Sequence, residues 1–289
     1  MDTLVKAMTK NGAIRILVTD TTQTVQEAAS RHKTLPTASA ALGRTLSATA
    51  LLGSQLKDKD ESVTVQINGK GPLGTILCEA NMVGEVRGFV ANPDVILIND
   101  ETHKLDVGKA VGKDGTLRVI RNTRMKADFT GTVELQTGEI GDDFAYYFTV
   151  SEQTPSAVSL GVLVGKDNEI LASGGLLIQM LPSASETDLL IAEDVVKHLR
   201  PISEMIHDGM TPDSIALALF EDVEIMGMST VKFKCSCSKD HLLDALSTID
   251  RDELEIMIKE DKGAEITCHF CNTTYQFTED ELTRIHRKS

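Results

Sequence analysis

The residues in this sequence best suited to chemistry are four cysteines, Cys235 and Cys237, then Cys268 and Cys271 after thirty intervening residues. Thiolates are good zinc ligands, and two close pairs can surround one ion tetrahedrally. The pattern therefore predicts one zinc ion bound by all four cysteines. Only one residue separates Cys235 from Cys237, fewer than structural zinc sites usually have. This spacing argues against a purely structural role, because neighbouring thiolates that lose their metal can form disulfides.

Three other residues could compete for a chemical role. His269 lies inside the second cysteine pair and His241 follows the first, so either could replace a thiolate as a ligand. With four cysteines available, we expect both histidines to be bystanders. The fifth cysteine, Cys78, has no cysteine or histidine near it in the sequence. We expect Cys78 to be a buried core thiol rather than a nucleophile.

The four cysteines fall in a predicted C-terminal module, residues 230–289. The patterns predict helices over 240–249 and 252–259, short strands over 231–234 and 265–267 and around Tyr275 and Phe277, and a capping box at 278–281. Large apolar side chains are few, so the module has a thin core. Zinc contributes roughly 10 to 16 kcal/mol to the folding of comparable small sites at neutral pH. Loss of the metal should therefore unfold the module.

Residues 1–180 predict an α+β domain built mainly from antiparallel sheet. Alternating apolar residues indicate strands over 13–19, 62–68, 75–79, 85–90, 116–121, 130–135, 156–164 and 169–180. A helix is predicted over 25–31 and another over 37–53. Arg44 is the only charged residue between Pro36 and Lys57. A surface helix would have a charged face, so we expect the helix over 37–53 to be central, where its small residues let sheets approach closely.

Residues 181–229 have the character of a helical linker. Helix starts are indicated at Ser185 and Thr211, each followed by apolar residues at helical spacing. Five of the ten methionines lie in this segment or directly before it: Met180, Met205, Met210, Met226 and Met228. Methionine adapts to irregular apolar partners, so an exposed segment of this kind could bind many partners. Periodicity alone favours the plainer interpretation, a linker packed on the main domain.

Composition disfavours several classes of function. A formal net charge of −14 opposes binding to nucleic acid or to anionic membranes, and aromatic residues are only 4% of the chain. We find no signal peptide, and Thr37 to Leu56 is too polar to be a membrane span. Four cysteines spaced for metal binding rather than for disulfides are typical of a protein in a reducing cytoplasm. The glycine-rich stretch Gly69 to Gly74 lacks the Gly-Lys-Ser/Thr ending of a phosphate loop, so we expect a hairpin turn.

The chain resembles, from end to end, the thirty-three-kilodalton heat-shock protein family, the redox-regulated holdase chaperones of bacteria. The cysteine array with its spacer near thirty residues is the most specific match. The other matching stretches are Ala40–Arg44, Gly69–Gly74, Val86–Val90, Ser151–Gln153 and Gly174–Pro182.

This resemblance implies a switch. In reducing conditions the four thiolates would hold zinc and the chaperone would be idle. On oxidation Cys235 would pair with Cys237 and Cys268 with Cys271, zinc would leave, and the module and linker would unfold. The exposed surface would then bind unfolding client proteins without ATP, as a homodimer. No enzymatic activity is implied.

Three alternatives remain open on the residues alone. A thiol-disulfide oxidoreductase could use the Cys268 and Cys271 dithiol, although that motif belongs at a helix start and short strands are predicted here. A zinc-ribbon nucleic-acid binder would need a basic face, but residues 230–289 hold nine Lys plus Arg against twelve Asp plus Glu. A constitutive chaperone with a purely structural zinc is the third.

Overall fold

The computed structural model describes residues 1–123 and 128–286. The chain forms two compact units, Met1–Lys234 and Cys235–Ser289, and each is described by itself below. The described residues contain ten helices, one large sheet in the first unit and a two-stranded sheet in the second. The predicted α+β class is therefore confirmed.

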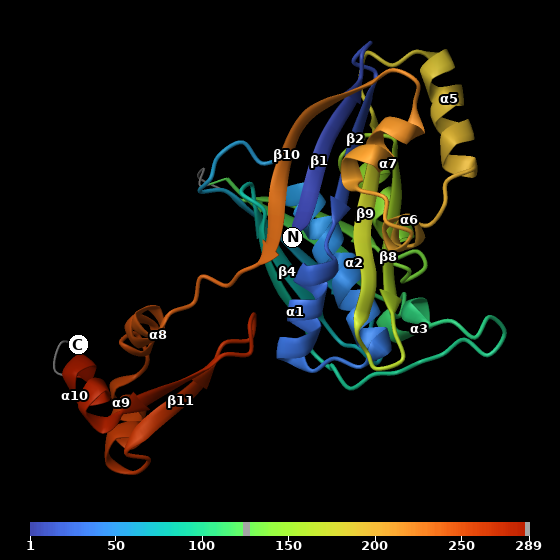
Figure 1. Cartoon of the computed structure of the whole chain (residues 1–289). Helices are drawn as coiled ribbons and strands as arrows, with labels where there is room; N and C mark the ends of the chain where they lie inside the picture. The colour runs from blue at the N-terminus through green and yellow to red at the C-terminus, as the bar shows by residue number, and fades with distance from the viewer. Residues whose placement is uncertain (124–127, 287–289) are drawn as a thin grey trace. The chain divides into compact units, whose positions relative to one another are not determined.

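The large sheet has ten strands in the order β7-β6-β3-β4-β5-β10-β1-β2-β9-β8 (Figure 1). Its strands are β1 (Asp2–Thr9), β2 (Ile14–Asp20), β3 (Ser62–Asn68), β4 (Ile76–Asn81), β5 (Glu85–Val90), β6 (Thr116–Asn122), β7 (Phe129–Glu134), β8 (Ser156–Val164), β9 (Ile170–Met180) and β10 (Val223–Phe233). All neighbours are antiparallel except β10 and β5. The eight strands predicted from alternation are all present, with small shifts at their ends.

A short parallel contact joins the two halves of this sheet. Strand β10 pairs with β5 only at Lys232 with Glu85 and at Phe233 with Val86. At the turn before β5, Gly84 has a φ of 80°, and a Cβ added to it would lie 1.9 Å from the carbonyl oxygen of Thr230 in β10. The junction therefore needs a glycine, both for its backbone angle and for its lack of a side chain.

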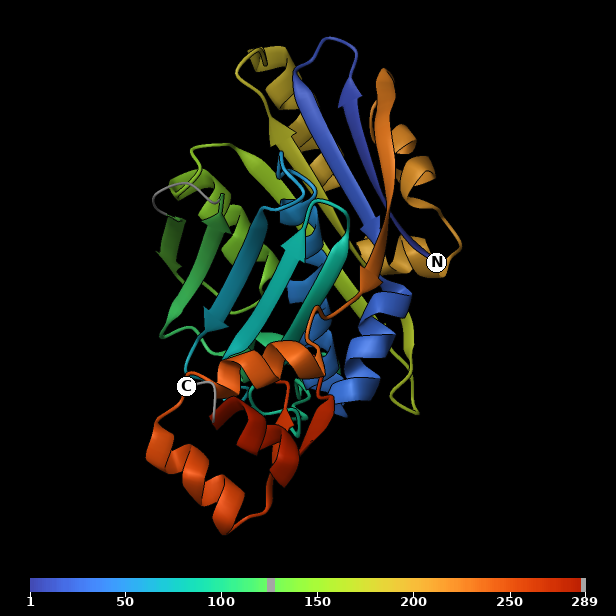
Figure 2. The ribbon, with the colours of Figure 1, turned by 90° about the vertical axis from the view of Figure 1, so that its left-hand side faces the viewer.

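Helix α2 (Pro36–Gly53) is the centre of the first unit. All its residues are buried except Pro36 and Arg44, and it packs against β4 and β5 of one half-sheet and β8 and β9 of the other (Figure 2). Small residues permit this approach: a Cβ on Gly43 would lie 2.7 Å from a methyl group of Val25. The Arg44 guanidinium pairs with Glu139 at 2.6 Å. The expected central position of this helix agrees with its burial. Within the described residues, none of the helices combines the length and apolar character that crossing a bilayer requires.

Three further helices pack around the main core of the first unit. They are α1 (Thr22–His32), α3 (Val107–Val111) and α4 (Gly141–Val150). Helix α4 packs against both outer strands, β7 and β8, and buries Phe144, Tyr147 and Phe148. Helix α4 was not predicted. Its apolar residues occupy a stretch too short for the helical period to stand out.

Three helices follow β9: α5 (Glu186–Lys197), α6 (Ile202–His207) and α7 (Pro212–Leu219). Helix α6 packs on β8 and β9, α7 packs on β1 and β2, and α5 lies to their side (Figure 1). They share an apolar cluster with the sheet, in which Met205 is buried and Met180 and Met210 are partly buried. Met226 and Met228 of β10 are exposed. Met180, Met205 and Met210 therefore fit a linker packed on the sheet, whereas Met226 and Met228 fit an exposed surface. The sequence had left these two interpretations open.

Helix α5 is the most weakly buried of the three. Its start agrees with the prediction, since the Ser185 hydroxyl accepts a hydrogen bond from the Asp188 amide at 3.2 Å. Only Ala192 is fully buried, whereas Leu190 and Ile191 are 65% and 49% exposed. Few contacts therefore oppose the release of α5 from the sheet.

One predicted element is longer than expected. The strand predicted over 231–234 is the end of β10, which begins at Val223 and pairs with β1. This pairing places Thr230 to Lys234 in the first compact unit, and the second begins at Cys235. The roles stay predictions: residues 1–180 as the core, dimerisation and client-binding domain, 181–229 as a metastable helical linker and 230–289 as a redox-sensing zinc module.

The second unit contains the hairpin β11 (Gly263–Thr267) and β12 (Thr274–Thr278), with α8 (Lys239–Leu246), α9 (Arg251–Lys259) and α10 (Glu279–His286). The predicted capping box is confirmed: the Thr278 amide donates to Glu281 Oε2 at 2.9 Å and the Glu281 amide donates to Thr278 Oγ1 at 3.3 Å. The buried core is small, as predicted: Leu246, Leu254, Cys271, Phe277, Leu282 and Ile285. Residues 287–289 of the predicted module lie outside the described residues.

Candidate metal centre

The four cysteines of the second unit form one cluster. Their Sγ atoms all lie within 4.8 Å of one another, and all four are free thiols. Cys235 Sγ lies 3.8 Å from Cys268 Sγ, and Cys237 Sγ lies 3.3 Å from Cys271 Sγ. A tetrahedral site with zinc–sulfur bonds of about 2.3 Å has sulfur atoms about 3.8 Å apart. The donor set and its spacing therefore fit one zinc ion.

Two segments of backbone position these thiols. Cys268 and Cys271 lie in the turn between β11 and β12, where the Cys268 carbonyl accepts hydrogen bonds from the amides of Cys271 at 3.3 Å and Asn272 at 2.7 Å. Asn272 has a φ of 54°, a left-handed conformation that asparagine tolerates. Cys235 and Cys237 lie between the end of β10 and the start of α8. The second pair is thus held by a closed turn and the first by an extended segment.

The structure adds two polar neighbours that the cysteine spacing does not indicate. The Tyr275 hydroxyl lies 3.2 Å from Cys237 Sγ and donates to the Cys237 carbonyl at 3.3 Å. The Thr273 hydroxyl lies 3.3 Å from Cys271 Sγ. Tyr275 was predicted only as part of a returning strand. Its place beside the thiols follows from the β11–β12 register, which pairs it with Ile266, two residues before Cys268.

The thiols differ in acidity. Burial is the main cause that raises the pKa of Cys237 to about 12. Burial alone would raise the pKa of Cys271 too, but hydrogen bonds with the side chain and backbone of Thr273 lower it, and the resulting pKa is about 7. Metal coordination requires thiolates, and a bound cation favours the deprotonated form. The site can therefore supply four thiolates when a divalent cation occupies it.

Neither histidine belongs to the cluster of potential ligands, which among the described residues consists of the four cysteines. Substituting His269 by Ala is expected to leave one zinc per chain, because four thiolates already complete a tetrahedral site. Zinc content by atomic emission and release of zinc to a colorimetric chelator would measure this. The matched variant His241→Ala should behave in the same way. A fall in stoichiometry in either variant would make that histidine a ligand.

Two other kinds of thiol chemistry, a dithiol active site at Cys268 and Cys271 and a nucleophile at Cys78, have unfavourable surroundings. The Cys268 and Cys271 dithiol lies in a β-hairpin turn, not at a helix start where the helix dipole lowers thiol pKa values. Cys78 is fully buried in the main core, and burial raises its pKa above the ordinary thiol value. Its prediction as a buried core thiol is confirmed.

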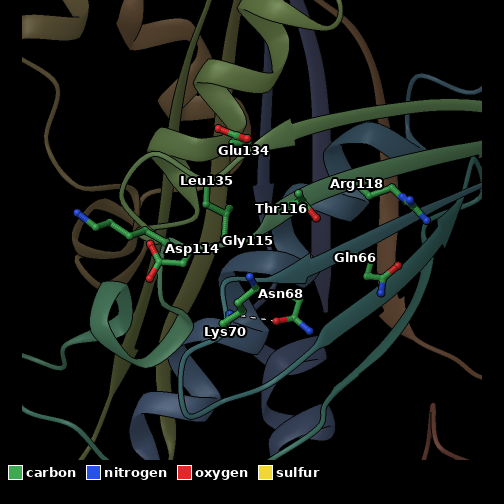
Figure 3. Close-up of a pocket in the computed structure, with 10 residues that line it drawn as sticks. Gln66, Asn68, Lys70, Asp114, Gly115, Thr116, Arg118, Glu134 and Leu135 are labelled. Carbon is green, nitrogen blue, oxygen red and sulfur yellow. Dashed lines mark hydrogen bonds between the residues drawn. The ribbon is translucent and has the colours of Figure 1, made fainter.

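The glycine-rich stretch Gly69 to Gly74 is the turn between antiparallel β3 and β4, as predicted. Beside it lies a pocket of about 670 Å³, in which the Asn68 side chain accepts a hydrogen bond from the Lys70 amide at 3.0 Å (Figure 3). The charged side chains that line this pocket have both signs: Lys70, Lys113, Asp114, Arg118 and Glu134. The turn leads into strand β4, so it offers no helix N-terminus for a phosphate group.

Comparison with known proteins gives consistent results. The family model described as "Hsp33 protein" matches residues 2–278. A protein named 33 kDa chaperonin from Bacillus licheniformis is 46% identical over 286 residues, which cover 99% of each chain. A protein of the same name from Staphylococcus aureus is 44% identical over 283 residues, covering 97% of this chain and 96% of that one.

A solved structure agrees with the fold of the whole chain. The crystal structure of a 33 kDa chaperonin from Thermotoga maritima, also described as a heat shock protein 33 homolog, matches with a TM-score of 0.90 at 34% sequence identity. The match covers 99% of this chain and 98% of that one.

Proposed function

Because the chain belongs to the Hsp33 protein family, we propose that it is a redox-regulated chaperone that holds unfolding proteins without ATP and catalyses no reaction. The family and the name 33 kDa chaperonin support a chaperone that binds unfolded clients. The observation that carries the redox part is the cluster of four free thiols within 4.8 Å. Thiols this close can bind one metal ion or be oxidised, but cannot do both.

In the reduced state Cys235, Cys237, Cys268 and Cys271 hold one zinc ion. Zinc supplies four strong bonds that tie the segment before α8 to the β11–β12 turn. Such sites contribute roughly 10 to 16 kcal/mol to folding at pH 7, more than a small core supplies alone. The second unit is then folded and the chaperone is inactive.

Oxidation removes the ligands. Each pair of thiolates gives up two electrons and forms a sulfur–sulfur bond, and hydrogen peroxide accepts these electrons, takes up two protons from solvent and leaves as two molecules of water. A disulfide sulfur no longer binds zinc, so the contribution of the metal to folding is lost. The second unit, which then has only its small apolar core, unfolds.

We propose that the disulfides join Cys235 to Cys237 and Cys268 to Cys271, as family membership suggests. Two close Sγ contacts run across the two pairs, from Cys235 to Cys268 at 3.8 Å and from Cys237 to Cys271 at 3.3 Å. Once the hairpin unfolds, each pair is held together only by its short spacing in sequence. Mass mapping of peptides from the oxidised protein distinguishes the two pairings.

Unfolding of the second unit extends into the linker, residues 181–229, and the apolar surface this exposes, with residues 1–180, binds clients as a homodimer in the cytoplasm. The weak burial of α5 supports this step, because Leu190 and Ile191 are already 65% and 49% exposed and Ala192 is its only buried residue. Releasing such a helix costs little free energy.

The test is light scattering from a heat-unfolding client protein, with this protein added either reduced and zinc-loaded or oxidised with peroxide at mildly raised temperature. Suppression of aggregation by the oxidised form only is expected. Equal suppression by both forms would reduce the zinc to a structural role. Suppression by neither, together with turnover of a disulfide substrate, would favour an oxidoreductase that uses Cys268 and Cys271.

A further inference from the structure

Strand β10 is held along only one of its edges for most of its length. It pairs with β1 from Val223 to Val231, but with β5 only at Lys232 and Phe233 (Figure 1). No further strand of the described residues pairs with it. Val231 is the only buried residue of β10, whereas five of the eight residues of β1 are buried. Strand β10 therefore separates from the sheet more readily than β1 does.

The proposed unfolding removes β10 from the sheet. Residues 223–229 of β10 belong to the linker, 181–229, and residues 230–233 belong to the predicted zinc module. Both segments unfold on oxidation in the proposed function. Strand β1 lies within residues 1–180 and keeps its other partner, β2. Oxidation therefore leaves β1 in a folded sheet with one unpaired edge, and this edge exists only in the active form.

The edge that β10 leaves is suited to another extended chain. Natural sheet edges are protected from further strands by charges, prolines or bulges on the edge strand. Strand β1 contains no proline, and the bulge in the β1–β10 ladder lies in β10. Its two charged side chains are engaged inside the first unit. The Asp2 carboxylate accepts hydrogen bonds from two amides at the start of α1, and Lys6 Nζ donates to the Ser54 carbonyl at the end of α2. Strand β1 thus lacks the usual protection against strand addition.

We propose that an extended segment of an unfolding client protein pairs with β1 along the edge that β10 leaves. The client is then bound through backbone hydrogen bonds, which read no particular sequence, so many clients fit. Val223 and Ile225 of β10 pack on the apolar cluster that includes Val5 and Ala7 of β1, whereas Met228 is exposed. A client segment with an apolar residue at every second position therefore fits best. This inference rests on the proposed chaperone function and gives it a mode of binding.

The directions of the amides in β10 provide a matched test. The Lys232 amide donates to a carbonyl in the turn before β5 at 3.0 Å, so it points away from β1. Amides alternate in direction along a regular strand, and the β1–β10 register is unbroken from 227 to 231. The Met228 and Thr230 amides therefore point away from β1 as well. The Ser229 and Val231 amides point toward β1.

The experiment measures fluorescence anisotropy of a fluorescein-labelled, blocked peptide with the sequence of β10, Val223–Phe233. The peptide is added to the full-length protein that has been oxidised and freed of peroxide. N-methylation of the peptide at the Ser229 and Val231 amides is expected to weaken binding about tenfold or more. N-methylation at the Met228 and Thr230 amides should weaken it less than about threefold. The reduced, zinc-loaded protein, in which β10 covers the edge, should bind the unmodified peptide at least about tenfold more weakly.

The chain's own β10 competes with the peptide in the oxidised protein. Ser229→Pro removes an amide that points toward β1, so it hinders the return of β10 and should strengthen peptide binding about threefold or more. Met228→Pro is the matched control, because it removes an amide that points away from β1 and should leave peptide binding unchanged within about twofold. Zinc content and thermal unfolding of the reduced variants check their fold.

Competition with an unfolded protein connects the edge to clients. Reduced, carboxymethylated α-lactalbumin, which stays unfolded, is expected to displace the labelled peptide from the oxidised protein. Equal loss with both N-methylated peptides, no binding of the unmodified peptide, or binding of α-lactalbumin without displacement of the peptide would overturn the proposal. Displacement of the peptide by a rise in protein concentration alone would assign the edge to a second copy of the chain and overturn it too.

Failure of this proposal is distinguishable from failure of the proposed function. Suppression of client aggregation by the oxidised protein does not depend on where the client binds, so it can persist when β1 is not the binding edge. An oxidised protein that neither binds α-lactalbumin nor suppresses aggregation would count against the chaperone function itself.

Discussion

Substituting Cys268 by Ser is expected to abolish stoichiometric zinc binding and unfold residues 235–286 while α2 and the strands of residues 1–180 stay folded. A serine hydroxyl is a poor zinc ligand, and three thiolates leave the tetrahedral site incomplete. The metal contributes roughly 10 to 16 kcal/mol, whereas the apolar core of the second unit has only a few fully buried side chains. The first unit has its own core around α2.

Zinc content and amide hydrogen exchange, followed by mass spectrometry, measure both parts of this expectation. Fast exchange should appear in peptides after Lys234 and in the linker, residues 181–229, into which the proposed unfolding extends, whereas β2 and α2 should keep their protection. Cys78→Ala is the control, because it removes a buried thiol outside the cluster and should leave one zinc per chain. A folded, zinc-free second unit in the Cys268→Ser variant would contradict the proposed dependence on metal.

Substituting Gly84 by Ala is expected to lower the free energy of unfolding of the first unit by about 3 kcal/mol or more. A left-handed backbone costs a non-glycine residue roughly 1 to 2 kcal/mol. At Gly84 the new methyl group would also lie 1.9 Å from the Thr230 carbonyl oxygen, which is backbone and cannot turn aside. The parallel contact between β10 and β5 must then open.

Gly12 separates these two causes. It has a φ of 70°, close to that of Gly84, but a Cβ added there meets no atom within 4 Å. Gly12→Ala should therefore cost only about 1 kcal/mol. Urea unfolding, followed by a probe in the large sheet, compares the two variants. Equal losses would mean that backbone angle alone explains the glycine at position 84.

The main elements of the first unit could be predicted because their residues act locally. Alternating apolar residues identified strands such as Ser62–Asn68, and the small uncharged residues of α2 indicated its burial. Strand β1 was not predicted, because two of its residues are polar and form hydrogen bonds with the ends of distant helices. The Asp2 carboxylate accepts hydrogen bonds from the Gln23 and Thr24 amides at the start of α1, and Lys6 Nζ donates to the Ser54 carbonyl at the end of α2. A polar residue with such a partner interrupts the alternation that identifies a strand.

The candidate metal centre was predictable to the level of its thiols. Spacing identified Cys235, Cys237, Cys268 and Cys271, because close pairs of cysteines bind metal from short turns. Tyr275 could not be assigned, since its contact with Cys237 depends on how the hairpin register meets a segment thirty-eight residues away.

The pairing of β1 with β10 has a consequence for synthesis of the chain. Thr9 of β1 lies opposite Val223 of β10, so one edge of β1 waits for its partner until most of the chain has been made. At about 5 to 20 residues per second, this wait is roughly 10 to 40 s. During it, the nascent chain carries an open sheet edge, the kind of surface on which unfolded proteins aggregate. The first cysteine of the candidate metal centre lies two residues after the end of β10. Closure of the sheet and assembly of the candidate metal centre therefore become possible within seconds of each other as the last part of the chain leaves the ribosome.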